Sequence, residues 1–322
     1  MFAIRESNRI DEAVIRYFHK GDPELKAAIE SVIDDMRDAK EYGSIISIRS
    51  VNFERLYARF DEIIDEIDLA DRRFALDDLL PVVRSAELLS TRFDVAVTNP
   101  PYMGGSGMNP KLSEFVKKNY PDTKSDMSTI FMEKTMKMCK ATGFISMINI
   151  PVWMFLSSYE KLRENIIAQN TVANMVHFGR GVFGSDFGTT AFVIAKTYVN
   201  GYKGTYRRLF EKQGAVDSVE TKEKWFFDGM GHFVADQANF SKIPGCPVAY
   251  WVGEKFINVF QSSVPLGSVA YSFQGLITGD NNHFLRFWFE PSEGKLCLHI
   301  RNSERHCYDG VWVPYQKGGN YR

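Results

Sequence analysis

The sequence predicts a protein of the α/β class in which a mostly helical segment precedes a parallel sheet. Residues 1–92 place apolar side chains three and four positions apart, which is the spacing of one helix face. Between residues 93 and 178, short β-rich runs alternate with helical segments, as in parallel strands joined by crossover helices. After residue 245 this spacing is mostly lost, and aromatic residues with Gly and Asn turns predict another domain at 246–322.

The first segment, residues 1–92, predicts three helices. The ranges 22–38 and 51–69 each carry one apolar face at helical spacing, and Pro23 suits the first turn of the earlier one. A third helix is expected over 71–89, with Pro81 marking a kink or a break because proline lacks the backbone N–H.

The central segment, residues 93–245, predicts alternating elements. A buried strand over 93–98 comes first, and a helix predicted over 126–142 is closed by Gly143 at its C′ position. Two successive antiparallel strands are expected at 189–199 and 204–210. The other expected elements are a helix at 110–119, a strand at 144–150, a helix at 158–169 and a strand at 171–178.

The composition is that of a folded protein without membrane or secretion signals. Hydrophobic residues make up 44% and charged residues 25% of the 322 residues, which excludes disordered, collagen-like and coiled-coil classes. No apolar run reaches the roughly 18 residues of a membrane span. Residues 1–9 also lack the apolar core of a signal peptide. We therefore expect a cytoplasmic protein with no membrane partner.

The four cysteines predict neither disulfides nor a metal site. They are scattered, and no two form a C-x-x-C pair. Cys297, His299, His306 and Cys307 are potential zinc ligands, but no pair among them has a usual zinc-finger spacing. We expect no metal.

Charge is distributed unevenly along the chain. Residues 1–98 hold 21 acidic and 14 basic side chains, a net charge of −7, whereas residues 99–322 hold 19 acidic and 25 basic, a net charge of +6. A basic excess in one portion is compatible with a phosphate-binding surface. A random scatter of solvated charges explains the counts equally well.

The tetrapeptide Asn99-Pro100-Pro101-Tyr102 directly follows the predicted strand 93–98. Its prolines fix φ and remove N–H donors, so the loop presents rigid carbonyl acceptors. Such acceptors suit a planar amine. If the Asn99 side-chain oxygen and the Pro100 carbonyl take its two hydrogens, the nitrogen lone pair can point at an electrophile while Tyr102 stacks on the ring. A Pro-Pro turn that only ends the strand explains neither the amide nor the ring.

The surrounding residues resemble S-adenosylmethionine-dependent amino-methyltransferases, especially adenine-N6 DNA enzymes of BREX phage-defence systems. The resemblance covers essentially the whole chain and lies in residues 5–8, 38–44, 93–102, 109–120, 124–126, 153–163, 278–286 and 314–319. It implies a partial Rossmann-like methyltransferase sheet, a helical N-terminal lead-in and a truncated mixed α/β target-recognition domain. It also implies S-adenosyl-L-methionine as cofactor, double-stranded DNA with a flipped adenine as substrate, and other phage-defence proteins as partners.

The resemblance implies roles for individual residues. Asn99, Pro100, Pro101 and Tyr102 hold the target adenine, and Phe183 matches a later aromatic position that contacts the flipped base. Asp126 opens the helix after the motif, where the family's cofactor pocket is partly lined, although a plain helix N-cap explains it equally well. The candidates for contacts to DNA phosphates, chosen by proximity to the motif, are Lys111, Lys117, Lys118 and Lys124.

The family's glycine-rich cofactor loop has no counterpart upstream of the tetrapeptide. Residues 1–98 contain only Gly21 and Gly43, and no strand is predicted before residue 93. We therefore expect that the chain is a fragment without the true N-terminus and cannot methylate alone. Residues 179–184 fit G-x-G-x-x-G, but a strand follows where a nucleotide site needs a helix. We interpret them as a hairpin that supports the base pocket.

Two alternative functions stay open. The same tetrapeptide serves methyltransferases that act on glutamine amides of release factors or on ribosomal RNA, although these usually lack a downstream aromatic domain such as 263–322. A non-catalytic DNA-binding remnant is the other alternative, and the basic excess after residue 98 would permit it.

Overall fold

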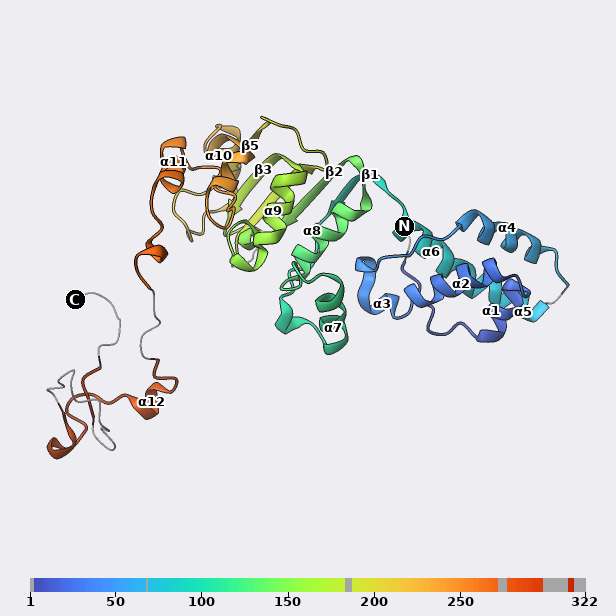
Figure 1. Ribbon diagram of the computed structural model, residues 1–322, viewed down its shortest axis with the longest axis horizontal. Helices are drawn as coiled ribbons and strands as arrows, with labels where there is room; N and C mark the ends of the chain where they lie inside the picture. Colours follow the sequence, from blue (N-terminus) through green and yellow to red (C-terminus); the bar gives the residue numbers. More distant parts are fainter. Residues whose placement is uncertain (1–2, 68, 183–186, 272–276, 298–311, 316–322) are drawn as a thin grey trace. The chain divides into compact units, whose positions relative to one another are not determined.

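The computed structural model describes residues 3–67, 69–182, 187–271, 277–297 and 312–315 (Figure 1). Its contacts divide the chain into two compact units, Met1–Ser263 and Val264–Arg322. The first unit contains a helical segment and a β-sheet with its own helices, and the second contains short helical turns. No helix within the described ranges is long and apolar enough to cross a membrane.

Six helices form the helical segment at the start of the first unit. Asp11, Asp22 and Asn52 accept hydrogen bonds from the first N–H groups of three of them, which stabilises the helix starts. Apolar side chains, among them Phe18 and Leu56, meet in one core. The helices are α1 (Glu12–His19), α2 (Pro23–Asp35), α3 (Ala39–Tyr42), α4 (Phe53–Ile64), α5 (Leu69–Phe74) and α6 (Leu80–Ser90).

The helix predicted over 71–89 is interrupted before Pro81. Helix α5 is followed by one π-helical turn, Ala75–Leu79, and then by α6, whose first turn contains Pro81. Proline has no N–H to continue the α-helical hydrogen bonds, and a π turn takes up the change in hydrogen bonding. The predicted irregularity at Pro81 is confirmed as this turn.

Six strands form the sheet, in the order β1-β2-β4-β3-β5-β6. β1 is parallel to β2 and β3 is parallel to β5, whereas β4 is antiparallel to both β2 and β3, and β6 is antiparallel to β5. The strands are β1 (Phe93–Thr98), β2 (Cys139–Asn149), β3 (Thr171–Gly179), β4 (Thr189–Ala195), β5 (Lys203–Arg208) and β6 (His232–Asp236). The α/β class is therefore confirmed, with a mixed sheet.

The two strands expected at 189–199 and 204–210 are not neighbours in the sheet. β4 lies between β2 and β3, and β5 pairs with β3 instead of with β4. The connection from β3 to β4 is too short for the crossover that parallel neighbours need, so β4 returns beside β3 in the antiparallel direction. The sequence predicted the direction of β4 but not its partners.

Helix α8 (Met127–Met138) ends earlier than predicted, so the expected C′ role of Gly143 is wrong. Cys139 already has an extended conformation, with φ −88° and ψ 148°, and it begins β2. Gly143 lies inside this strand, where a Cβ would come within 2.9 Å of the Asp94 carbonyl oxygen. A close approach of two strands therefore accounts for this glycine.

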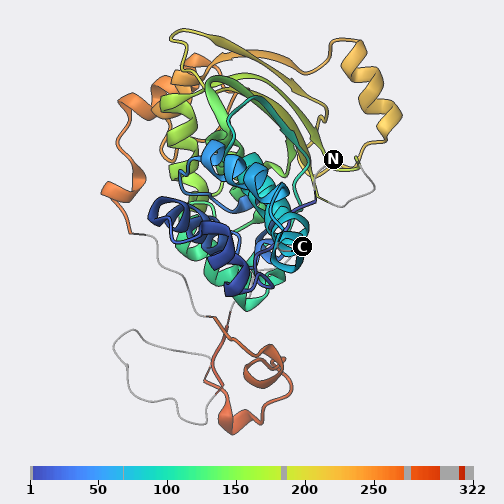
Figure 2. The same cartoon turned by 90° about the vertical axis from the view of Figure 1, so that its right-hand side faces the viewer.

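One face of the sheet packs against α8 and α9 (Glu160–Gln169), as Figures 1 and 2 show. The core on this face includes Met147 and Phe192. On the opposite face of β1 and β2, Val95 is 54% exposed, Val97 is 73% exposed and Phe144 is 45% exposed. The prediction of a buried strand over 93–98 is therefore wrong, because side chains on one face of β1 are exposed.

Among the described residues after β5, three helices lie where the sequence analysis placed none, as do α1 and α3 in the helical segment. Helix α11 shows why, because it buries only Ile257, which packs against Ile243 and Ala249 in a small cluster. A single buried side chain leaves no clear periodic pattern in a short helix. The three helices are α10 (Val219–Phe227), α11 (Glu254–Ser262) and α12 (Asn281–Phe284). In contrast, α7 (Pro110–Asn119) has the bounds that were expected.

Lys134 of α8 joins the helical segment to the sheet layer through a buried contact. Its Nζ donates a hydrogen bond to the Ile46 carbonyl, and the residue is 4% exposed. Burial lowers the pKa of Lys134 to about 8, with smaller contributions from the positive charges of Arg92 and Lys137. Keeping the Lys134 amine protonated therefore costs free energy in the folded protein.

Lys134→Met should remove a pH dependence of stability. The pKa of about 8 in the folded chain lies below the ordinary 10.5, so the unfolded chain binds more protons between these values. The free energy of unfolding of the wild type should therefore rise by about 1 kcal/mol relative to Lys134→Met between about pH 8 and pH 9.5. Urea unfolding at several pH values measures this, with Lys118→Met at an exposed position of α7 as control. Parallel pH profiles would contradict the lowered pKa.

Candidate functional site

The tetrapeptide Asn99–Tyr102 begins where β1 ends. Asn99 is exposed, Pro100 is buried and Tyr102 is half-buried. The Tyr102 hydroxyl donates a hydrogen bond to Asn99 Oδ1 over 3.1 Å. Burial raises the pKa of the Tyr102 phenol above its ordinary value, so at neutral pH the hydroxyl keeps its proton. The end of β1 thus presents a side-chain amide and an aromatic ring side by side.

The loop after the tetrapeptide is fastened to the start of α8. The Gly105 N–H donates to the Ser125 carbonyl at 3.1 Å, and the Met127 N–H donates to the Met103 carbonyl at 3.0 Å. Both bonds join backbone groups, so they hold the loop whatever side chains it carries. The position of Tyr102 is therefore coupled to the position of α8.

Asp126 stands at this junction and caps α8. Its Oδ1 accepts hydrogen bonds from the N–H and the hydroxyl of Ser128 at 2.8 and 2.6 Å. The residue forms an isolated bridge with Gly104 and is 8% exposed. Its Oδ2 lies 3.8 Å from the place that a Cβ on Gly104 would take. The geometry is that of an N-cap, and a role towards the cofactor stays a prediction.

Phe187 is an aromatic neighbour of Tyr102. The two ring centroids are 5.5 Å apart, and the ring planes meet at 87°. Phe187 is 47% exposed and lies just before β4. Phe183, the predicted neighbour, lies outside the described residues, and its role stays a prediction. The sequence analysis missed Phe187, although it is the next aromatic residue in the connection between β3 and β4.

The four candidate lysines differ in their surroundings. Lys111 forms an ion pair with Asp38, Nζ to Oδ2 at 2.7 Å, and this hydrogen-bonded contact raises the pKa of Lys111. Lys117 and Lys118 in the last turn of α7, and Lys124 beyond it, are exposed. No ion pair joins these three to another residue of the described ranges. Their ammonium groups are therefore available to an anion, whereas Lys111 is engaged.

Gly179 and Gly181 belong to the run that fits a glycine fingerprint, and both are explained by packing. Their φ angles are 69° and 92°, which favour glycine. A Cβ on Gly179 would lie 2.7 Å from the Phe210 ring, and one on Gly181 would lie 2.7 Å from the Asp217 carbonyl. The next element given by the structure is β4, antiparallel to β3, and no helix starts among the described residues of this connection to receive a phosphate.

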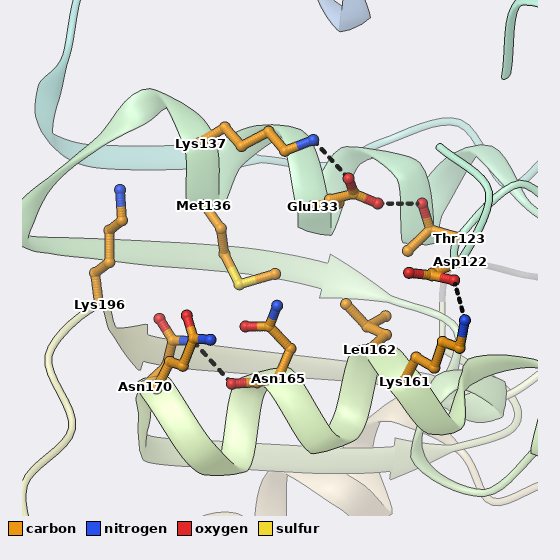
Figure 3. Close-up of a pocket in the computed structure, with 11 residues that line it drawn as sticks. Asp122, Thr123, Glu133, Met136, Lys137, Lys161, Leu162, Asn165, Asn170 and Lys196 are labelled. Carbon is orange, nitrogen blue, oxygen red and sulfur yellow. Dashed lines mark hydrogen bonds and ion pairs between the residues drawn. The ribbon is translucent and has the colours of Figure 1, made fainter. Parts of the chain in front are cut away.

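A cavity of about 250 Å³ lies between α8 and α9 (Figure 3). None of the residues that line it belongs to the tetrapeptide. Each of its three lysines already has a partner, a carboxylate for two of them and a backbone carbonyl for the third. The pairs are Lys137 with Glu133 at 2.6 Å, Lys161 with Asp122 at 3.2 Å, and Lys196 with the Cys139 carbonyl at 2.6 Å.

Known proteins match this chain over nearly its full length. Residues 28–183 match the family of the Eco57I restriction-modification methylase. The chain is 33% identical over 320 residues to the adenine-specific methyltransferase PglX of Lacticaseibacillus casei, covering 94% of this chain and 26% of the relative. It is 38% identical over 294 residues to the adenine-specific methyltransferase BrxX of Escherichia coli O9:H4, covering 88% and 23%. The chain thus spans about a quarter of the length of these relatives.

A solved structure shows a more distant similarity. The methyltransferase subunit of a type I restriction-modification system from Streptococcus thermophilus is 14% identical with a TM-score of 0.34, covering 47% of this chain and 36% of that one. The tetrapeptide Asn99–Tyr102 lies within the range matched by the methylase family. The chain is therefore similar to the adenine-specific methyltransferases PglX and BrxX over most of its own length, and its residues 28–183 match the Eco57I restriction-modification methylase family.

Proposed function

We propose that this chain supplies the target-base side of a site-specific DNA adenine-N6 methyltransferase of the BREX or restriction-modification type. The observation that carries the proposal is the exposed Asn99 amide at the end of β1, which accepts a hydrogen bond from Tyr102, whose ring in turn meets the Phe187 ring edge-on. The names of PglX and BrxX, both adenine-specific methyltransferases, support adenine as the base.

Asn99 and Pro100 can make the exocyclic amine of adenine a nucleophile. Asn99 Oδ1 has two lone pairs, of which the Tyr102 hydroxyl uses one. The other accepts one hydrogen of the amine, and the Pro100 carbonyl accepts the second. With both hydrogens held by acceptors, the nitrogen lone pair is drawn out of conjugation with the ring and points towards a methyl donor. The Tyr102 ring meanwhile stacks on the base.

S-adenosyl-L-methionine, when bound, supplies the methyl group. The described residues fit the cofactor side only in part, because residues 3–67 and 69–92 contain helices and no strand that ends in a glycine-rich turn. Asp126 is our single candidate for a cofactor contact, given its place between Gly104 and α8. We assign no step of the reaction to the cofactor side.

The proposed substrate is double-stranded DNA with the adenine flipped out. An adenine inside a duplex has its amine paired, so it must leave the stack at a cost of a few kcal/mol. Lys117, Lys118 and Lys124 are exposed and can meet phosphates near the tetrapeptide, and phosphate contacts position a protein on DNA without reading the sequence. This function places the protein in the cytoplasm, with other phage-defence proteins as partners.

The test is a chimaera in which this chain replaces the matching segment of the Lacticaseibacillus casei PglX. We expect it to transfer labelled methyl groups from S-adenosyl-L-methionine to adenine in duplex DNA, and not to ribosomal RNA or to a glutamine of a release factor. Transfer to RNA or to protein would favour the alternative substrates. A chimaera that binds DNA and the cofactor yet transfers nothing would favour a non-catalytic DNA-binding role for this chain.

Two substitutions of Tyr102 should separate the ring from its hydroxyl. Tyr102→Phe keeps the ring beside Phe187 and loses only the hydrogen bond to Asn99, so the transfer rate of the chimaera should fall about fivefold. Tyr102→Ala also removes the stacking surface, so the rate should fall by about 50-fold or more. Single-turnover methylation measures both rates. Equal losses in the two variants would contradict stacking by the ring.

A further inference from the structure

A second cavity, of about 430 Å³, opens beyond the ends of β3 and β5. β1 is parallel to β2, and β3 shares this direction because β4 is antiparallel to both β2 and β3. β5 is parallel to β3. The strands β1, β2, β3 and β5 therefore end at the same edge of the sheet, and the cavity shares that edge with the tetrapeptide. In sheets with parallel strands, ligands bind outside the carboxyl ends.

Two exposed aromatic rings form the entrance of this cavity. Phe155 is 40% exposed and Trp251 is 36% exposed, and their ring centroids are 5.8 Å apart. Trp251 contacts the buried Tyr250 edge-on at 4.9 Å, and Tyr250 stacks on the buried Tyr206 at 4.7 Å and 3°. The buried rings therefore hold Trp251 in place while part of its face stays open to solvent.

Arg208 supplies the positive charge of the cavity. Its guanidinium lies over the rings of Phe210 at 5.6 Å and Phe233 at 5.4 Å. No ion pair or side-chain hydrogen bond joins it to another residue of the described ranges, although Glu211 also lines the cavity. At the floor, burial lowers the pKa of His177 to about 4, helped by the charges of Arg208 and Lys222, so this ring is neutral at physiological pH.

We propose that this cavity binds a nucleotide of the DNA strand other than the target adenine, with its base on Trp251 and its phosphate on Arg208. A flat apolar ring beside an unneutralised guanidinium matches the two parts of a nucleotide. Glu211 is exposed and lines the cavity, so its carboxylate can accept from an amino group of the base. The cavity between α8 and α9 differs, because none of the residues that line it is aromatic. The proposal rests on the proposed function in DNA.

The proposal predicts which substitutions weaken DNA binding by the 322-residue chain. A fluorescein-labelled single-stranded dodecamer is the probe, and fluorescence anisotropy is the readout. Trp251→Ala should lower the affinity about tenfold, since stacking of one base contributes about 1–3 kcal/mol. Trp251→Phe should keep most of the affinity. Arg208→Met should also weaken binding and reduce the slope of log K against log salt by about 0.7, the value for one phosphate contact to a single strand.

Phe227→Ala is the matched control, because Phe227 is 76% exposed on α10 and does not line the cavity. It should bind like the wild type. Wild-type affinity in both Trp251→Ala and Arg208→Met would overturn the proposal, as would a wild-type chain that does not bind the dodecamer. Neither result touches the target-base site, which is tested separately by methyl transfer in the chimaera. If the chimaera transferred no methyl groups while Trp251→Ala and Arg208→Met still weakened binding of the dodecamer, the result would count against the proposed function alone.

Discussion

Asn99→Ala in the PglX chimaera should lower the rate of methyl transfer to adenine by about 100-fold or more, which is the usual cost of removing one preorganised hydrogen-bonding group from a reacting centre. The tetrapeptide has two side-chain oxygens. The Tyr102 hydroxyl donates its hydrogen to Asn99 Oδ1, and Asn99 is exposed, so Asn99 Oδ1 is the side-chain oxygen that can accept a hydrogen bond from a substrate. Without it, one amine hydrogen has no acceptor and the nitrogen lone pair stays conjugated with the ring.

DNA affinity should change little in the same variant, since phosphate contacts carry most of the affinity. Asn99→Asp keeps an acceptor oxygen at the same place and should retain more activity than Asn99→Ala. Asn119→Ala, at the exposed end of α7, is the control and should leave both the rate and the affinity unchanged. A full transfer rate in Asn99→Ala would remove Asn99 from the proposed site. Parallel losses of rate and DNA affinity would assign it to DNA binding.

The elements with strong local signals were predictable from the sequence. The strand 93–98 and the helix 110–119 have the bounds that were expected. Both are delimited by residues whose effect is local: Pro100 and Pro101 cannot continue a strand ladder, and Asn109 caps the helix that Pro110 begins. The tetrapeptide could be found for the same reason, because its chemistry is contained in four consecutive residues.

Features that depend on distant parts of the chain were not predictable. The place of β4 between β2 and β3 follows from which strands pair, and no single strand carries that information. Gly143 resembles a helix C′ residue in sequence, but its neighbour in space is the Asp94 carbonyl. Phe187 meets Tyr102 only after β1 and β4 are in place. Phe155 and Trp251 likewise lie far apart in the sequence, and only the fold brings their rings together at the cavity beyond the ends of β3 and β5.

Arg163→Met should destabilise the first unit by about 3–5 kcal/mol. Arg163 of α9 is 1% exposed, and its guanidinium makes four hydrogen bonds to backbone carbonyl groups. Two go to Gly245 at 3.0 and 2.6 Å, and the others go to Trp153 at 2.9 Å and Leu156 at 2.7 Å. Burial lowers the pKa of Arg163 from its ordinary value, but a guanidinium stays charged. These carbonyls, together with the negative charges of Glu160 and Glu164, therefore compensate the loss of hydration.

Methionine fills similar space but leaves those carbonyl oxygens buried without donors, and each unsatisfied group costs about 1–3 kcal/mol. The melting temperature of Arg163→Met should therefore be about 10 °C below that of the wild type. Arg163→Lys should have a melting temperature between those of the wild type and Arg163→Met, because one ammonium cannot reach all three carbonyl groups. Lys161→Met on the same helix removes an exposed ion pair with Asp122 and should cost less than about 1 kcal/mol. Because Arg163 also holds the segment that carries Phe155, Arg163→Lys should weaken binding of the dodecamer as well. Equal melting temperatures for Arg163→Met and Lys161→Met would show that the guanidinium does not hold this junction.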